Sequence, residues 1–108
     1  MAIGIEITQG TKEIIPVTIV DKTNVTTDLS GMSPKFWFQK PDDTYVYNSA
    51  TASATGLRID CLVETSSGGP GGLLALGLYR LYVGWTNGAT SEVVKKFAQY
   101  VTITLPTV

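Results

Sequence analysis

Apolar and polar residues alternate with a period of two through most of this chain, in short runs separated by glycine, proline and asparagine. Successive side chains of a β-strand point to opposite faces, so this period indicates strands with one buried face. The clearest runs are residues 57–64 and 79–85. No stretch has the 3.6-residue period of an amphipathic helix. We therefore expect an all-β protein.

Turn signals divide the chain into seven or eight strands. Asn87–Gly88 is the strongest hairpin signal. Pro16 cannot donate to a ladder, so its strand should lie at a sheet edge or carry a bulge. In the aromatic run 35–39, Phe36 and Phe38 share one face and Trp37 takes the other. The pattern predicts a single antiparallel Ig-like β-sandwich over residues 1–108, with a small jelly roll or Greek-key barrel as the alternative.

The charge balance and hydropathy exclude two classes of partner. Eight Lys and Arg against nine Asp and Glu give a net charge of −1, which cannot release many phosphate counterions, so we expect no nucleic-acid binding. The longest apolar stretch, 73–83, is interrupted by Gly77 and Arg80, so we expect no membrane span. The first residues lack the basic and apolar regions of a signal peptide. We expect synthesis in, and release from, a cytoplasm.

The residue types needed for catalysis are scarce. The chain has no histidine, which is the commonest general base and metal ligand. Cys61 is the only cysteine and lies in an apolar register, so we expect an inert core thiol and no disulfide or zinc cluster. Asp42 and Asp43 follow a proline between two strands, which is typical of a turn. Residues 68–72 are rich in glycine but lack the lysine and helix of a phosphate loop. We expect a non-enzymatic protein without cofactor or metal.

Several aromatic and basic residues are candidates for partner contact. Trp37 and Tyr82 fall on the outward faces of their strands, where an exposed aromatic favours a subunit interface over a ligand site. Lysines near a sheet edge typically prevent that edge from pairing with a strand of another chain, although these two could also contact an anionic group. The candidate contact residues are Trp37, Tyr45, Tyr47, Tyr82, Lys95 and Lys96.

The order of the segments resembles a known family. The segments that carry the resemblance are Gln9-Gly10-Thr11-Lys12-Glu13-Ile14-Ile15-Pro16-Val17-Thr18-Ile19, Thr27-Asp28-Leu29-Ser30-Gly31, Phe36-Trp37-Phe38, Gly77-Leu78-Tyr79-Arg80-Leu81-Tyr82-Val83 and Asn87-Gly88. Together they resemble the Ig-like module at the N-terminus of baseplate upper proteins in tailed bacteriophages, over about residues 9–105. The chain has Thr11-Lys12 where that family often has Asp-Thr.

The resemblance implies a structural protein of a tailed-phage virion. Such a protein would be a multi-copy subunit or homo-oligomer that binds other capsid, neck, tail or baseplate proteins, and it would be located in the virion. Only 16% of the residues are charged, which suits a subunit with much of its surface buried against neighbours. The alternative is a carbohydrate- or receptor-binding β-sandwich, with exposed Trp37 or Tyr82 near Asp42 or Asp43.

Overall fold

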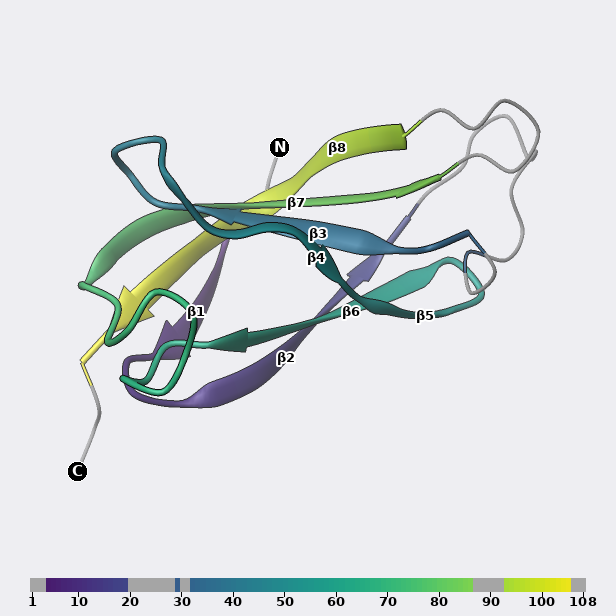
Figure 1. The fold of residues 1–108 in the computed structure, drawn as a ribbon. Coiled ribbons are helices and arrows are strands. Elements are labelled where there is room, and N and C mark those ends of the chain that lie inside the picture. The colour runs from purple at the N-terminus through teal and green to yellow at the C-terminus, as the bar shows by residue number, and fades with distance from the viewer. Residues whose placement is uncertain (1–3, 20–28, 30–31, 87–92, 106–108) are drawn as a thin grey trace.

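The computed structural model describes residues 4–19, 29, 32–86 and 93–105, and all its regular elements are β-strands. Two sheets pack face to face (Figure 1). The five-stranded sheet has the order β1-β8-β7-β3-β4, and the three-stranded sheet has the order β2-β6-β5. The strands are β1 (Ile5–Thr8), β2 (Lys12–Thr18), β3 (Lys35–Gln39), β4 (Tyr45–Thr51), β5 (Ser53–Thr55), β6 (Arg58–Glu64), β7 (Gly77–Thr86) and β8 (Val93–Thr104).

The strand order is that of an Ig-like sandwich, as the sequence predicts. An Ig domain pairs strands B, E and D in one sheet and G, F and C in the other, with C′ added beside C in variable-type domains. Strands β2, β6 and β5 take the places of B, E and D, and β8, β7, β3 and β4 take those of G, F, C and C′. The first strand departs from the constant-type arrangement, because β1 pairs in parallel with β8 instead of joining β2.

The core lies between the sheets and follows the predicted alternation. Phe36 and Phe38 point inward from β3, and the Phe38 ring stacks on Tyr79 of β7 with centroids 5.1 Å apart. Burial of each large apolar side chain contributes about 1.5–3 kcal/mol, so this layer supplies much of the stability. The inward residues of β6 and β7 that the alternation identified are buried, namely Ile59, Cys61, Val63, Tyr79, Leu81, Val83 and Trp85.

The edges of the sheets explain two local sequence features. Strand β2, which contains Pro16, lies at the edge of the three-stranded sheet, as predicted for a strand with a proline. Strands β7 and β8 pair from Thr86 and Val93 onward as a hairpin, whereas the Asn87–Gly88 signal itself lies outside the described residues. On the other flank, β4 belongs to the larger sheet and β5, which follows after one residue, to the smaller.

A buried threonine joins the ends of β1, β2 and β6. Thr65 is fully buried, and its hydroxyl donates to the carbonyl of Thr8 at 3.0 Å and accepts from the amide of Thr11 at 3.0 Å. Its amide donates to the Thr11 carbonyl at 2.8 Å. These bonds satisfy polar groups that would otherwise be buried without partners.

Candidate functional site

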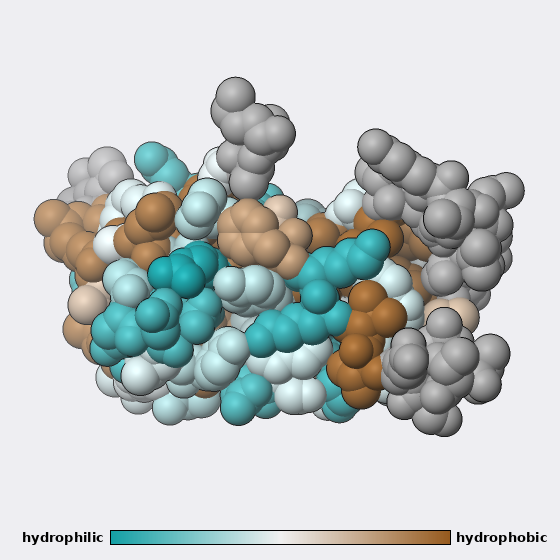
Figure 2. Space-filling view, turned by 90° about the horizontal axis from the view of Figure 1, so that it is seen from above, coloured by the Kyte–Doolittle hydropathy of each residue, from teal (hydrophilic) through white to brown (hydrophobic). Residues whose placement is uncertain are grey.

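The outer face of the five-stranded sheet carries most of the exposed aromatic residues. Tyr79 and Leu81 point into the core, so Leu78, Arg80 and Tyr82 of β7 point outward. Figure 2 looks down on this face and shows brown hydrophobic residues standing among teal polar ones. Neighbouring strands place Trp37 and Phe97 opposite Tyr82. Side chains far apart in the sequence are therefore brought into one cluster.

Three of these aromatic rings surround a lysine ammonium group. The Nζ atom of Lys95 lies 4.8 Å from the ring centroids of Tyr45 and Tyr82, and 5.0 Å from that of Trp37. It also donates a 2.7 Å hydrogen bond to Tyr45 Oη. Ring faces attract cations at these distances. We call Trp37, Tyr45 and Tyr82 the aromatic cage, and four of the six predicted contact residues meet in it.

Gly84 makes room for the indole at the bottom of the cage. A Cβ atom at Gly84 would lie 2.9 Å from Trp37 Cζ3 and would run into the carbonyl of Val94. The indole therefore occupies space next to a position without a side chain. Trp37 faces outward as predicted, yet it is only 7% exposed because its neighbours cover it.

A shallow groove runs beside the cage over β7 and β8. Its volume is about 550 Å³, and it is lined by Pro41, Leu78, Arg80, Tyr82, Phe97 and Tyr100. The Phe97 ring meets Tyr82 edge-on, with centroids 5.5 Å apart and planes at 71°. The Phe97 ring also meets Tyr100 edge-on, with centroids 5.1 Å apart and planes at 64°. Aromatic pairs prefer such edge-to-face arrangements.

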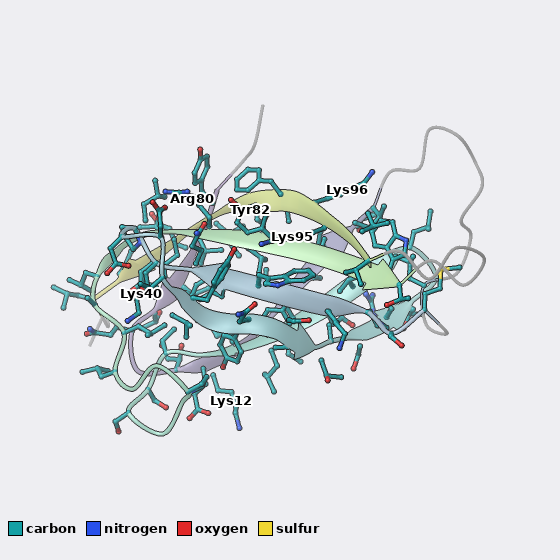
Figure 3. All side chains as sticks on the ribbon, turned by 45° about the horizontal axis from the view of Figure 1, so that its top comes forward. Lys12, Lys40, Arg80, Tyr82, Lys95 and Lys96 are labelled. Atoms are coloured by element: carbon teal, nitrogen blue, oxygen red, sulfur yellow. The ribbon has the colours of Figure 1, made fainter. Side chains whose placement is uncertain are left out.

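A polar network lies at one end of the groove. Arg80 Nη2 is 3.1 Å from Asp43 Oδ1, and its Nη1 donates to Gln39 Oε1 at 3.5 Å. Gln39 in turn donates from Nε2 to the Asp43 carbonyl at 3.0 Å. A hydrogen bond with Tyr82 and the nearby Asp43 carboxylate raise the pKa of Arg80, so it remains a cation. Figure 3 shows Arg80, Tyr82 and Lys95 on the same face of the sheet.

The two aspartates of the β3–β4 turn have different partners. Asp42 Oδ1 accepts hydrogen bonds from the amide and hydroxyl of Thr44, at 3.1 and 2.6 Å, and these bonds lower the Asp42 pKa. This is the side-chain geometry expected of a turn aspartate. Asp43 has φ of 73°, and this left-handed conformation is tolerated by aspartate. Its carboxylate is directed instead to Arg80.

The two remaining contact candidates lie away from the cage. Tyr47 packs against Phe36 with centroids 4.9 Å apart, and its hydroxyl accepts from the Glu64 amide at 2.9 Å, so it bridges the two sheets. Lys96 lies 6.0 Å from the Trp85 ring and borders a hollow of about 180 Å³ beside Val17 and Ile19. Neither residue belongs to the aromatic cage or to the groove.

Phe97 and Tyr100 are exposed aromatic residues that are absent from the predicted contact residues. A register shift between Leu81 and Tyr82 inserts an extra residue into β8, which places both rings on the outer face although they are three residues apart. An irregular spacing of this kind is invisible to a period-two pattern. Arg80 could have been found, because it occupies the outward register beside the predicted core residues Tyr79 and Leu81.

Metal, thiol and membrane features are sparse in the described part of the chain. No group of three or more potential metal ligands occurs there. Cys61 is buried, and desolvation raises the pKa of its thiol to about 12. No helix in the described ranges has the length and hydropathy to cross a membrane.

The site and the strand order define the chain as an Ig-like β-sandwich with an aromatic outer face. No protein-family model, curated protein or solved structure matches it.

Proposed function

We propose that this chain is a non-enzymatic structural protein of a tailed-phage virion, a multi-copy subunit that binds other virion proteins. The phage assignment rests on the resemblance of its sequence segments to the Ig-like module of baseplate upper proteins. The binding role rests on one structural observation, which is that large apolar side chains are exposed on both outer faces of the sandwich.

The smaller sheet carries a compact apolar pair. Ile14 of β2 and Leu62 of β6 lie opposite each other in the ladder and are 64% and 46% exposed. We call them the Ile14–Leu62 patch. Directly opposite residues in a sheet have adjacent side chains, so the patch is continuous. Exposed pairs of this kind favour burial against a neighbour.

The larger sheet offers a second contact area of different character. Tyr45 of the aromatic cage and Lys95, which the cage surrounds, are exposed, and tyrosine is enriched at protein interfaces. Leu73 and Leu76, in the segment that precedes β7, are also exposed. A protein in a closed assembly contacts neighbours in several directions, and these separate areas suit that arrangement.

Sedimentation velocity over a wide concentration range tests self-association through the Ile14–Leu62 patch. We expect a discrete oligomer that Leu62→Glu converts to monomer, because a charge would be buried at the contact. Thr18→Glu, an exposed change on the same sheet, is the matched control and should leave the oligomer intact. A wild-type monomer at every concentration would contradict self-assembly through this surface.

The proposed location of the chain in the virion is tested on purified phage particles. Mass spectrometry of purified particles of the phage that encodes the chain should detect it at a fixed copy number. Immunogold labelling should place it at one position on the head or tail. Its absence from washed particles would contradict the structural role.

A further inference from the structure

We propose that the groove over β7 and β8 is a binding site for a neutral carbohydrate, which stacks on Phe97 and Tyr100 and hydrogen-bonds to Arg80 and Asp43. This activity goes beyond contact between protein subunits. It uses a different surface from the Ile14–Leu62 patch, so the two proposals can fail separately.

The size and lining of the groove suit a small ligand. Ligand sites commonly have volumes of about 300–1,000 Å³ and a mainly apolar lining with a few convergent polar groups. The groove has about 550 Å³, and its lining is apolar except for Arg80 and the tyrosine hydroxyls. Its aromatic rings are also accessible, because Phe97 is 40% exposed and Tyr100 is 38% exposed.

The aromatic rings of the groove supply the apolar contacts for a sugar. A pyranose ring presents C–H groups on its faces and hydroxyl groups around its rim. The face of an aromatic ring carries negative charge density and attracts positively polarised hydrogens. The edge-on contacts of Phe97 with Tyr82 and Tyr100 favour these orientations of the three rings. A favoured orientation lowers the side-chain entropy that is lost on binding.

The polar network of Arg80 and Asp43 supplies hydrogen bonds for the sugar hydroxyl groups. A sugar hydroxyl both donates and accepts hydrogen bonds. Arg80 offers N–H donors and the exposed Asp43 carboxylate offers acceptors, and the two groups are 3.1 Å apart. Donors and acceptors side by side match neighbouring hydroxyls on one sugar ring.

The charges favour a neutral sugar over an acidic one. Arg80, the cation that lines the groove, is already paired with Asp43. Lys95 lies over the Tyr82 ring and donates to Tyr45, and it is five residues from Tyr100 along β8. A carboxylate on the ligand would therefore compete with Asp43 for its partner. A proline-rich peptide would also stack on tyrosines, but prolines have no backbone N–H to donate to Asp43.

Affinity electrophoresis tests the proposal in native gels that contain hydroxyethyl cellulose, galactomannan, xylan or dextran. At least one of these neutral polysaccharides should retard the wild-type protein. Tyr100→Ala should weaken that retention by about tenfold or more, as expected when an anchoring aromatic is truncated. Tyr100→Phe keeps the ring and should retain binding, which separates stacking from a folding defect. Ser53→Ala, an exposed change on β5 of the other sheet and outside the Ile14–Leu62 patch, is the control and should bind as the wild type does.

Two results would overturn the carbohydrate site. The first is a wild-type protein that none of these polysaccharides retards; if that protein instead binds a polyproline peptide, followed by tryptophan fluorescence, the groove is a peptide site. The second is retention that Tyr100→Ala and Arg80→Met leave unchanged, which would place the sugar elsewhere. Neither of these results depends on self-association. The structural role is tested separately, by sedimentation velocity and by the analysis of purified particles.

Discussion

Lys95 Nζ donates a 2.7 Å hydrogen bond to Tyr45 Oη although β7 and β3 lie between their two strands. Neighbouring strands are about 4.8 Å apart, so the two side chains span three strand spacings between them. The position opposite Lys95 on β7 is Gly84, whose missing side chain leaves the path open. The indole of Trp37 fills the space below. The aromatic cage thus depends on a glycine that makes none of its polar contacts.

The coupling between Lys95 and Tyr45 should be measurable in a double-mutant cycle. Lys95→Met keeps the length of the side chain and removes its charge, and Tyr45→Phe removes the hydroxyl. We expect a coupling free energy of about 0.5–1 kcal/mol, because exposed cation–π contacts and hydrogen bonds contribute amounts of that order. Urea unfolding of the four proteins gives the value. Strictly additive effects would show that the hydrogen bond does not stabilise the protein.

Gly84→Ala should destabilise the protein by about 1–3 kcal/mol, the usual cost of overpacking. The added methyl group would run into the Val94 carbonyl and press on Trp37. Gly4→Ala is the control, because its Cβ would lie 3.4 Å from the nearest atom, the Tyr100 carbonyl oxygen. Thermal unfolding followed by circular dichroism compares the two. Equal melting temperatures for Gly84→Ala and the wild type would contradict the close packing.

The sequence was sufficient to predict the core and its strands because one face of each strand is buried. In β6, and in β7 as far as Val83, burial alternates without interruption, and Ile59, Cys61 and Leu81 are each fully buried as expected. Pro16 likewise identified an edge strand, because a proline removes a ladder donor. These features are local, so they can be read from neighbouring residues alone.

The outer face could not be predicted in the same way, because it depends on register between distant strands. Trp37, Tyr82 and Phe97 become neighbours only through the pairing of β3 with β7 and of β7 with β8. The extra residue in β8 then moves Phe97 and Tyr100 onto one face. The Arg80–Asp43 pair similarly joins a strand to a turn 37 residues earlier (80 − 43). No sequence pattern specifies a contact between residues so far apart in the chain.

The free energy of unfolding should fall with rising pH above about 9, and Cys61 should contribute to that fall. Desolvation raises the pKa of the buried thiol from 9.0 to about 12, so the folded state holds its proton where the unfolded state has lost it. Between these values the folded state binds more protons, and each pH unit lowers stability by up to about 1.4 kcal/mol.

Urea unfolding between pH 8 and 11 measures this linkage in the wild type and in Cys61→Ala. The variant should be less stable at pH 8, because it leaves a small cavity, but it should lose less stability as the pH rises. All other ionisable groups are the same in both proteins, so the difference in slope isolates the thiol. Parallel slopes would contradict a thiol whose pKa is raised by burial.

Pro16 protects an open sheet edge, and its replacement should cause association. The Ile19 amide donates to the Leu57 carbonyl, and the Thr65 amide donates to the Thr11 carbonyl. Odd-numbered residues of β2 therefore bond toward β6, and even-numbered residues direct their backbone groups to the other side. Pro16 thus removes an N–H from the middle of an edge that no strand of the described residues covers.

Pro16→Thr restores that N–H and favours strand conformation, so we expect edge-to-edge association of the variant. Light scattering at increasing concentration should show particles larger than any wild-type species, and thioflavin T would report extended sheet. Pro41→Thr, in the β3–β4 turn, is the control and should scatter as the wild type does. An unchanged Pro16→Thr protein would show that the twist and charges of β2, including Lys12, are sufficient to protect the edge without the proline.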